Sequence, residues 1–347
     1  MTMIQKIRQL DSAEAYLLTS VENVAYATGF SGDSSQVLVT PGGAFFFTDS
    51  RFVEMAREEI GSRAEVICTG GQERLPSIAK RLSGIARLGI EQGNVTVREF
   101  GEFKKAFPTK EYTDISDDML LMRMVKTEEE LEKIGTAARA NEVALNELLP
   151  YIKPGVCELD IRAELEYRMK KQGMDLAFPT IAAGGLNSAV PHATPSGYRI
   201  RSGDFLTLDF GCRYDGYCSD ITRTFGIGNI DGESKKIYDI VNEAQRRAQQ
   251  EAQIGADTYR VDEAARSYIA ENGYGAYYDH GTGHGVGRQI HELPVLNPRS
   301  SYILQKNMVF TVEPGIYVPG LGGVRIEDTL VAGRGSVYEF SKELILL

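Results

Sequence analysis

The sequence predicts a smaller α/β domain over residues 1–122 and an α+β domain over residues 123–347. Three observations lead to this division. The length of 347 residues exceeds that of one average domain. The first part alternates strand-like and helix-like segments, whereas the second part repeats its own motifs at an offset of roughly one hundred residues. We therefore expect the second domain to be a duplicated unit, each half of which is a helix pair followed by antiparallel strands.

Short apolar runs bounded by turn residues predict the strands of the first domain. A Pro-Gly-Gly turn at residues 41–43 joins two of them into a hairpin. Ser50 is a candidate N-cap for the helix that follows, and Gly61 ends that helix. This part contains no histidine and no cluster of catalytic residue types. The predicted strands are 15–20, 36–40, 44–49 and 86–92, and the predicted helices are 50–61 and 97–107.

The second domain begins with helices whose ends are marked in the sequence. Thr127 and Glu130 have the spacing of a capping box, which predicts a long helix that starts there and stops at Pro154–Gly155. A second helix spans residues 158–173. The domain boundary is therefore expected within residues 120–127.

Motifs recur in the same order in the two halves of the second domain. Each match alone is weak, but chance hardly explains an ordered set. Corresponding residues of a duplicated unit usually surround a shared centre, and here they are one imidazole and two carboxylates from each half. The matches are segments 155–173 and 255–273, HATP (192–195) and HELP (291–294), TLDFG (207–211) and TVEPG (311–315), and DIT (220–222) and EDT (327–329).

Composition and charge exclude several classes of partner. The net charge of −10 argues against nucleic acid or an anionic membrane surface as the main partner. No stretch approaches the ~20 apolar residues of a membrane span, and the N-terminus lacks the pattern of a signal peptide. The four cysteines form no CxxC pair. A reduced, cytoplasmic location is therefore expected.

Asp209 and Asp220 are expected to share one face of a hairpin formed by residues 205–225. The sequence allows two registers for this hairpin. With a turn at 214–215 the two side chains face each other directly, and with a turn at 215–216 they are diagonal neighbours. Either register leaves the carboxylates within about 5–8 Å of one another. Like charges so placed destabilise a sheet unless a cation compensates them.

The second half offers an equivalent carboxylate pair. A turn centred on Gly320 sets Glu313 opposite Glu327, again on one face. Four carboxylates exceed what one ion needs and suit two divalent metal ions about 3.5–4 Å apart. The mostly oxygen donor set favours Mn²⁺, with Co²⁺, Zn²⁺ or Fe²⁺ as alternatives. A single strand aspartate is usually a solvated or turn residue, but that explanation does not account for two same-face pairs repeated between halves.

Three of the four histidines lie in the glycine-rich segment 279–294, DHGTGHGVGRQIHELP, and the fourth is His192 in PHATP. A lone histidine is more often a packed or surface residue than a ligand, yet all four lie within or beside the repeated strands. The segment does not match a phosphate-binding loop, because it lacks G-x-G-x-x-G and a following Lys-Ser/Thr. Its glycines are expected to let the backbone approach closely around His284.

Longer motifs in these segments resemble those of the Xaa-Pro peptidases, the family that contains aminopeptidase P and prolidase. The resemblance covers residues 127–347. It implies the pita-bread fold, itself a duplicated half, which methionine aminopeptidase shares. The preceding residues resemble the creatinase-type N-terminal domain of the family more loosely. The resembling motifs are LDFG (208–211), YCSDITRTF (217–225), GTGHGVGRQIHELP (281–294), FTVEPGIYVPGLGGVRIEDT (310–329) and PHATP (191–195).

The resemblance implies a dinuclear metal site. Asp220 and Glu327 would bridge or share the two ions. Asp209 would complete the site of one ion, and His284 and Glu313 would complete that of the other. Glu313 would also act as the general base toward the bridging water.

The resemblance implies further roles around these ligands. His192 and His291 would contact the substrate and stabilise the tetrahedral intermediate. His280, Arg325 and Thr222 are candidate neighbours of the ligands, and His280 has no firm role. Homodimers are common in the family, so a homodimer is expected.

The implied function is metal-dependent hydrolysis of the bond between an N-terminal residue and proline. A strict dipeptidase must bind the proline carboxylate, which a bidentate arginine does best. Some prolidases have a basic residue directly after the HELP position, where this chain has the apolar Val295. We therefore expect an Xaa-Pro aminopeptidase, with an Xaa-Pro dipeptidase as the alternative. Arg288 and Arg299 remain candidate carboxylate partners, whereas Arg325 is as well placed to orient the metal-binding carboxylates.

Three other functions are less well supported. A non-catalytic binding module on the same fold would have lost ligands, and a creatine-type amidinohydrolase needs no metal. The complete set of ligand residues argues against both. Methionine aminopeptidase shares the ligands, but the additional N-terminal domain and the HELP and GGVRIED motifs favour the Xaa-Pro group.

Overall fold

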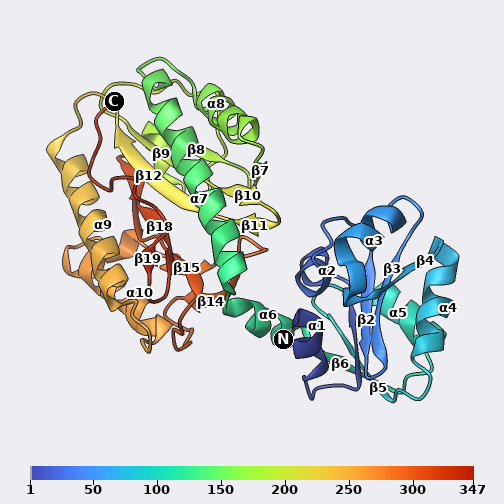
Figure 1. Cartoon of the computed structure of the whole chain (residues 1–347). Helices are drawn as coiled ribbons and strands as arrows, with labels where there is room; N and C mark the ends of the chain where they lie inside the picture. The colour runs from blue at the N-terminus through green and yellow to red at the C-terminus, as the bar shows by residue number, and fades with distance from the viewer. Residues whose placement is uncertain (1) are drawn as a thin grey trace. The chain divides into compact units, whose positions relative to one another are not determined.

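A computed structural model describes residues 2–347, and the chain divides into two compact units. The N-terminal unit is Met1–Met122 and the C-terminal unit is Arg123–Leu347. In Figure 1 the N-terminal unit runs from blue to cyan-green and the C-terminal unit from green to red. Helix α6 (Ser116–Met124) crosses the division.

The N-terminal unit is a mixed sheet with strand order β4-β3-β2-β1-β5-β6 and helices on both faces. Alternate residues of β1 enter different cores: Tyr16 and Leu18 pack with α1 and α2, whereas Ala15 and Leu17 pack with α4 and α5. Burial on both faces explains the continuous apolar run in this strand. The bounds are β1 (Ala15–Leu18), β2 (Gln36–Thr40), β3 (Gly43–Thr48), β4 (Glu65–Cys68), β5 (Arg87–Ile90), β6 (Glu111–Asp114), α1 (Met3–Arg8), α2 (Val21–Thr28), α3 (Val53–Ile60), α4 (Gly71–Arg81) and α5 (Val97–Ala106).

The hairpin predicted around the Pro-Gly-Gly turn is confirmed, but the predicted start of the next helix is wrong. Strands β2 and β3 pair with Thr40 opposite Gly43. Helix α3 has Phe52, not Ser50, at its N-cap, and this residue makes no side-chain cap hydrogen bond. Asp49 shapes the preceding turn instead, because its Oδ1 accepts from the Arg51 amide at 2.9 Å.

The C-terminal unit opens with the predicted capping box. The Thr127 side chain accepts from the Glu130 amide, and the Glu130 side chain accepts from the Thr127 amide. Helix α7 ends at Leu148, earlier than predicted, because Pro150 cannot donate the next helical hydrogen bond. The helices are α7 (Glu128–Leu148), α8 (Glu158–Lys171), α9 (Gly232–Glu251) and α10 (Thr258–Glu271).

The strands of the C-terminal unit form one long antiparallel sheet and smaller additions. The long sheet has the order β14-β13-β15-β18-β12-β9-β8, and β19 pairs with β18. The bounds are β7 (Asp175–Leu176), β8 (Ile181–Gly184), β9 (Phe205–Phe210), β10 (Cys212–Tyr214), β11 (Tyr217–Cys218), β12 (Ile221–Gly226), β13 (Gly283–Gly285), β14 (Glu292–Leu296), β15 (Val309–Val312), β16 (Gly315–Val318), β17 (Gly322–Arg325), β18 (Glu327–Val331) and β19 (Gly335–Ser336).

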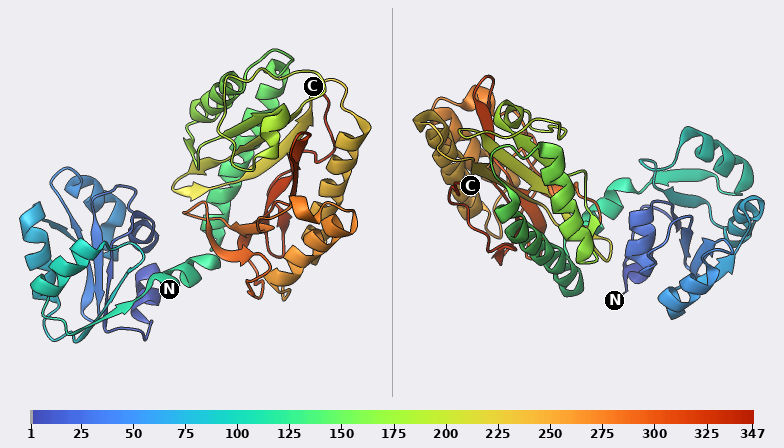
Figure 2. Two further views of the ribbon diagram at one scale, coloured as in Figure 1. Left: turned by 180° about the vertical axis from the view of Figure 1, so that it is seen from behind. Right: turned by 90° about the horizontal axis from the view of Figure 1, so that it is seen from above.

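The two halves of this unit have the same layout. The order β13-β15-β18 in one half mirrors β8-β9-β12 in the other, and the halves meet where β12 pairs with β18. Helices α7 and α8 pack on strands of the first half, and α9 and α10 on strands of the second. Figures 1 and 2 show these helix pairs on the outer side of the strands. The internal repeat of the sequence thus corresponds to two similar helix-and-strand layers.

Two global properties complete the description of residues 2–347. No helix in this range combines the length and the apolar character that crossing a membrane requires. Among the cysteines, Cys68 is exposed, and Cys157, Cys212 and Cys218 are buried.

Candidate active site

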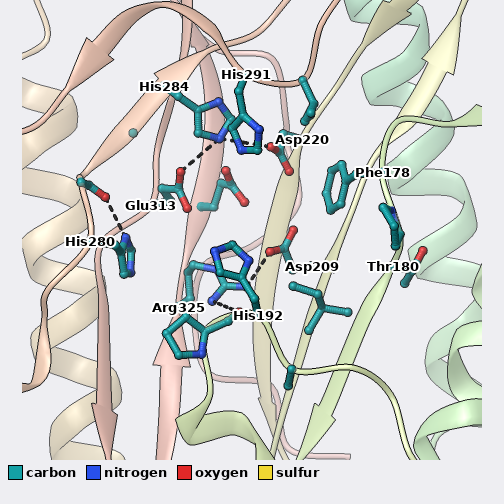
Figure 3. A pocket seen from close by; sticks show the side chains of 18 of the residues that line it. Phe178, Thr180, His192, Asp209, Asp220, His280, His284, His291, Glu313 and Arg325 are labelled. Carbon is teal, nitrogen blue, oxygen red and sulfur yellow. Dashed lines mark hydrogen bonds and ion pairs between the residues drawn. The ribbon is translucent and has the colours of Figure 1, made fainter.

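A cavity of about 550 Å³ lies where the two halves of the C-terminal unit meet. Its wall contains every histidine of the chain together with the carboxylates that the repeat singles out. Figure 3 shows His284, Glu313, Asp209 and Asp220 pointing toward a common centre. The sequence-predicted residues in the wall are His192, His280, His284, His291, Asp209, Asp220, Glu313, Arg325 and Glu327.

The first hairpin adopts the diagonal register. Strands β9 and β12 pair with Thr222 opposite Asp209, which leaves Asp220 diagonal to Asp209 on the same face. The turn lies at Asp215 and Gly216, whose φ angles are 47° and 78°. Two successive residues with positive φ make the tight turn that suits twisted strands. This turn decides between the two registers that the sequence left open.

The second hairpin has the single register that the sequence predicted. Strands β15 and β18 pair with Val312 opposite Asp328, so Glu313 and Glu327 follow as the next facing positions. The two halves join where Thr222 pairs with Glu327 across β12 and β18. One carboxylate pair from each half therefore converges at the central strand pair.

Three of these carboxylates have buried oxygens that nothing satisfies. Asp209 Oδ1, Asp220 Oδ1 and Glu327 Oε1 have no hydrogen-bond partner in the described part of the chain. Burial, and then the charges of neighbouring carboxylates, raise the pKa values of Asp220 and Glu327 well above their ordinary range. Unpaired buried acceptors and crowded negative charge both cost free energy. A cation is the partner that this donor set calls for.

His284 adds a nitrogen donor to the carboxylates. Its Nε2 lies 3.3 Å from Glu313 Oε1 and 3.7 Å from Asp220 Oδ2. Asp220, His284 and Glu327 each offer a ligand atom, and these atoms lie within 4.8 Å of one another. Such a set of oxygen with some nitrogen suits a divalent transition-metal ion. The geometry is therefore that of a site that could hold metal.

His284 and Glu313 stabilise the charged forms of one another. Burial opposes the charged form of each group, but their mutual hydrogen bond and attraction outweigh it. They lower the pKa of Glu313 to about 2 and raise the pKa of His284. Thr311 holds both residues, because its hydroxyl donates to Glu313 Oε1 at 3.1 Å and accepts from the His284 amide at 3.1 Å.

Arg325 and Thr222 hold two of the carboxylates. Arg325 Nη2 donates to Asp209 Oδ2 at 2.5 Å, and its Nε donates to Thr222 Oγ1 at 3.2 Å. Thr222 Oγ1 in turn donates to Glu327 Oε2 at 2.6 Å. These contacts satisfy one oxygen of each carboxylate and leave the other free for a cation.

His280 lies at the far end of the same network. Its Nδ1 donates to the carbonyl of Gly281 at 2.8 Å, so its Nε2 accepts from the Tyr317 hydroxyl at 3.0 Å. That hydroxyl accepts from Arg325 Nη1 at 2.8 Å. Burial lowers the pKa of His280 and raises the pKa of Tyr317 to about 12. His280 therefore supports Arg325 through Tyr317 and does not point at the carboxylate centre.

His192 and His291 line the cavity outside the carboxylate cluster (Figure 3). The His291 ring packs edge-on against His284, with ring centroids 4.3 Å apart. Burial, followed by the charge of His284, lowers the pKa of His291. His291 is therefore a neutral imidazole at neutral pH and can donate a hydrogen bond to a substrate.

The cavity wall also contains residues that the sequence analysis missed, namely Arg162, Phe178, Thr180 and Ile290. Phe178 and Thr180 directly precede β8, and Ile290 precedes His291, so their closeness to motif residues was the available signal. Val295 lines the cavity as well. Arg288 and Arg299 are absent from the wall formed by residues 2–347, and the Arg288 guanidinium lies 4.6 Å from the centre of the Tyr217 ring.

Comparisons with known proteins agree with this site. The chain matches the model of metallopeptidase family M24 over residues 132–334 and that of the creatinase/prolidase N-terminal domain over residues 2–125. It is 37% identical to the Xaa-Pro dipeptidase of Pyrococcus horikoshii, with 96% of this chain and 93% of the relative covered.

Solved structures extend the similarity to the whole fold. An Xaa-Pro dipeptidase from Bacillus anthracis matches with a TM-score of 0.96 and 39% identity, over 99% of both chains. An X-Pro aminopeptidase from Thermotoga maritima matches with a TM-score of 0.90 and 36% identity, over 96% of this chain and 98% of that one. The chain therefore belongs to the Xaa-Pro peptidases of metallopeptidase family M24, with the pita-bread fold, a creatinase-type N-terminal domain and metallopeptidase activity.

Proposed function

We propose that this metallopeptidase hydrolyses Xaa-Pro dipeptides with two divalent metal ions. One observation carries the proposal: buried carboxylate oxygens without partners lie beside His284 in a cavity whose wall contains all four histidines. The relatives support the dipeptide, because the proteins from Pyrococcus horikoshii and Bacillus anthracis are both named Xaa-Pro dipeptidases. We therefore propose a dipeptidase in place of the aminopeptidase that Val295 suggested.

The donor set divides between two ions. Asp209 would bind one ion, His284 and Glu313 would bind the other, and Asp220 and Glu327 would be shared. When bound, two such ions would lower the pKa of a bound water molecule and polarise the scissile carbonyl. The preponderance of oxygen ligands favours Mn²⁺, although Co²⁺, Zn²⁺ and Fe²⁺ are alternatives.

The residues around the ions would carry out the proton transfers and position the substrate. Glu313 would accept the proton of the attacking water, since its carboxylate points into the centre of the site beside His284. His291 would donate an N–H to the developing oxyanion of the substrate. His192 would contact the substrate from the segment that follows β8. A pocket of this kind is needed because the tertiary amide bond to proline is bulky and offers no N–H.

An Xaa-Pro aminopeptidase is the second candidate. Val295 lines the cavity at the position that argued for it, and an apolar side chain there offers no charge to a proline carboxylate. The Thermotoga maritima relative is named an X-Pro aminopeptidase. The chemistry of the two candidates is the same, and their substrates differ only in whether the peptide chain continues beyond the proline.

The kcat/KM values for Ala-Pro, Ala-Pro-Ala and a longer Xaa-Pro peptide decide between them. The proposal expects Ala-Pro to be hydrolysed best in Mn²⁺-loaded protein. Faster hydrolysis of the longer peptides would establish the aminopeptidase instead.

We also propose that the protein is a homodimer, as is common in the family. Light scattering coupled to size-exclusion chromatography would give twice the chain mass of 38.3 kDa. A monomer mass would contradict this. The cytoplasmic location expected from the sequence stays a prediction.

A further inference from the structure

An Xaa-Pro dipeptide ends in a carboxylate one residue beyond the scissile bond. A cavity that takes up this group must supply a positive or hydrogen-bonding partner, because an unpaired buried charge is costly. Val295 does not supply one. This inference rests on the proposed dipeptidase function, which requires that another residue of the wall bind the carboxylate.

Arg325 is not available for this purpose. Within residues 2–347, the arginines that line the cavity are Arg162 and Arg325, and no lysine does. The Arg325 guanidinium is completely engaged, by Asp209, Thr222 and Tyr317 and by the carbonyl of Pro191. Moving it to a substrate would release Asp209, on which the proposed metal site depends.

Arg162 is only loosely engaged. It lies on α8, and its side chain is 37% exposed. Its Nε is buried and has no hydrogen-bond partner among the described residues. Its ion-pair partner, Glu166, lies one turn further along the helix at 4.0 Å from Nε. A partly exposed pair at this distance is weak, so a substrate carboxylate can replace it.

Glu158, one turn before Arg162 on α8, fastens this part of the helix to the cavity wall. The fully buried Glu158 accepts from the Gly184 amide at 2.7 Å and from the Ser196 amide at 2.8 Å. These bonds tie this helix face to β8 and to the segment that bears His192. Arg162, which lines the cavity, thus stands on a helix that is fastened to the cavity wall.

Thr180 supplies a second donor in the same wall. Its side chain is buried, and Oγ1 makes no hydrogen bond to any residue between 2 and 347. Figure 3 shows it on the side of the cavity that also bears Phe178. An arginine guanidinium can bind a carboxylate through two N–H groups, and a threonine hydroxyl can donate a further hydrogen bond.

We propose that Arg162, with Thr180, binds the C-terminal carboxylate of the dipeptide and so determines the preference for dipeptides. This carboxylate site would stand in place of a basic residue at position 295. Arg162 is a specificity residue in this proposal and takes no part in proton transfer.

The test compares ligands that differ only in the carboxylate. Calorimetry measures the binding of L-proline and L-prolinamide to the Mn²⁺-loaded protein, and kinetics measures Ala-Pro and Ala-Pro-amide. Arg162→Met should weaken proline binding and raise the KM for Ala-Pro by about 10- to 100-fold, with kcat nearly unchanged. Prolinamide and Ala-Pro-amide should bind equally well to the variant and the wild type.

Two further variants serve as controls. Lys170→Met removes one positive charge from the solvent side of the same helix and should change nothing. Arg162→Lys should recover part of the proline affinity. Equal thermal stability of the variants excludes a folding defect.

The outcomes separate this inference from the proposed function. If wild type binds proline no better than prolinamide, or if Arg162→Met weakens both alike, the role of Arg162 is overturned even though dipeptides are cleaved. If the wild type cleaves only longer peptides, the dipeptidase proposal fails. The binding of L-proline to wild type and Arg162→Met still tests whether Arg162 binds a carboxylate.

Discussion

Glu313 is the residue at which the proposed metal binding and proton transfer coincide. Glu313→Gln keeps an oxygen for the metal and for the Thr311 hydroxyl but cannot accept a proton. We expect kcat to fall about 10²- to 10⁴-fold with the fold intact. Steady-state kinetics together with the metal content by mass spectrometry checks this. A nearly normal kcat would assign the base to another residue.

His291 is expected to act on the substrate and not on the metal. It packs against His284 but has a pKa lowered by burial, which leaves a neutral ring that can donate to an oxyanion. His291→Ala should lower kcat about 10²-fold and leave the metal content near that of the wild type. His284→Ala is the matched comparison and should lose metal. Loss of metal in both variants would make His291 a ligand.

The raised pKa values of Asp220 and Glu327 predict a pH dependence of metal-linked stability. A carboxyl group with a higher pKa in the folded state binds protons better when folded, so its contribution to stability is lost as pH rises through that pKa. Bound metal replaces these protons. The difference in Tm between metal-loaded and metal-free protein should therefore grow as the pH is raised from about 5 to about 8. A difference that shrinks over this range would contradict the argument.

At the scale of elements, the segment that bears His291 is held by a buried ion cluster. Glu292 accepts from Lys126 Nζ at 2.7 Å and from Arg123 Nη2 at 3.1 Å. All three side chains are at most 3% exposed. The cluster therefore joins the end of α6 and the start of the C-terminal unit to the HELP segment, next to a residue that would contact the substrate.

Glu292→Gln should destabilise the C-terminal unit strongly, because it removes the negative charge that lies between the buried Arg123 and Lys126. The expected loss is about 3–5 kcal/mol in the free energy of unfolding, with a lower kcat from the displaced His291. Urea unfolding and kinetics measure the two effects. Glu271→Gln, at an exposed helix position, is the control and should change neither. A Glu292→Gln protein as stable as this control would contradict the role of the cluster.

Some elements could be predicted from the sequence more closely than others. The register that faces Glu313 with Glu327 followed from one glycine turn, because strand side chains alternate strictly. The register of Asp209 and Asp220 stayed open, since two turns one residue apart were equally plausible until the positive φ of Asp215 was known. The Glu292 cluster could not be predicted, because Glu292 lies more than 160 positions from Arg123 and Lys126 in the sequence.

At the scale of the whole molecule, the duplication was predictable because both halves keep their order of motifs. It explains why a pair of carboxylates from each half meets at β12 and β18. Arg162 escaped prediction for the opposite reason. It lies outside every repeated motif, and only the packing of α8 on β8 brings it into the cavity wall. Repeats reveal a shared centre, whereas the outer wall of a pocket depends on tertiary packing.

Metal removal should affect the two units differently, because the carboxylates belong only to the C-terminal unit. Chelation with EDTA should abolish peptidase activity, and Mn²⁺ or Co²⁺ should restore it. Without metal, the carboxyl groups at the junction of the halves lose the ions that hold them together, so backbone amides of β9, β12, β15 and β18 should exchange hydrogen faster. The sheet β1–β6 is the internal control and should exchange at an unchanged rate. Hydrogen-exchange mass spectrometry of metal-loaded and metal-free protein measures the amides of the junction strands and those of the control sheet.

Two outcomes would contradict this prediction. Full activity in rigorously metal-free protein would refute the metal requirement, and equal exchange at the junction strands would place the ions elsewhere.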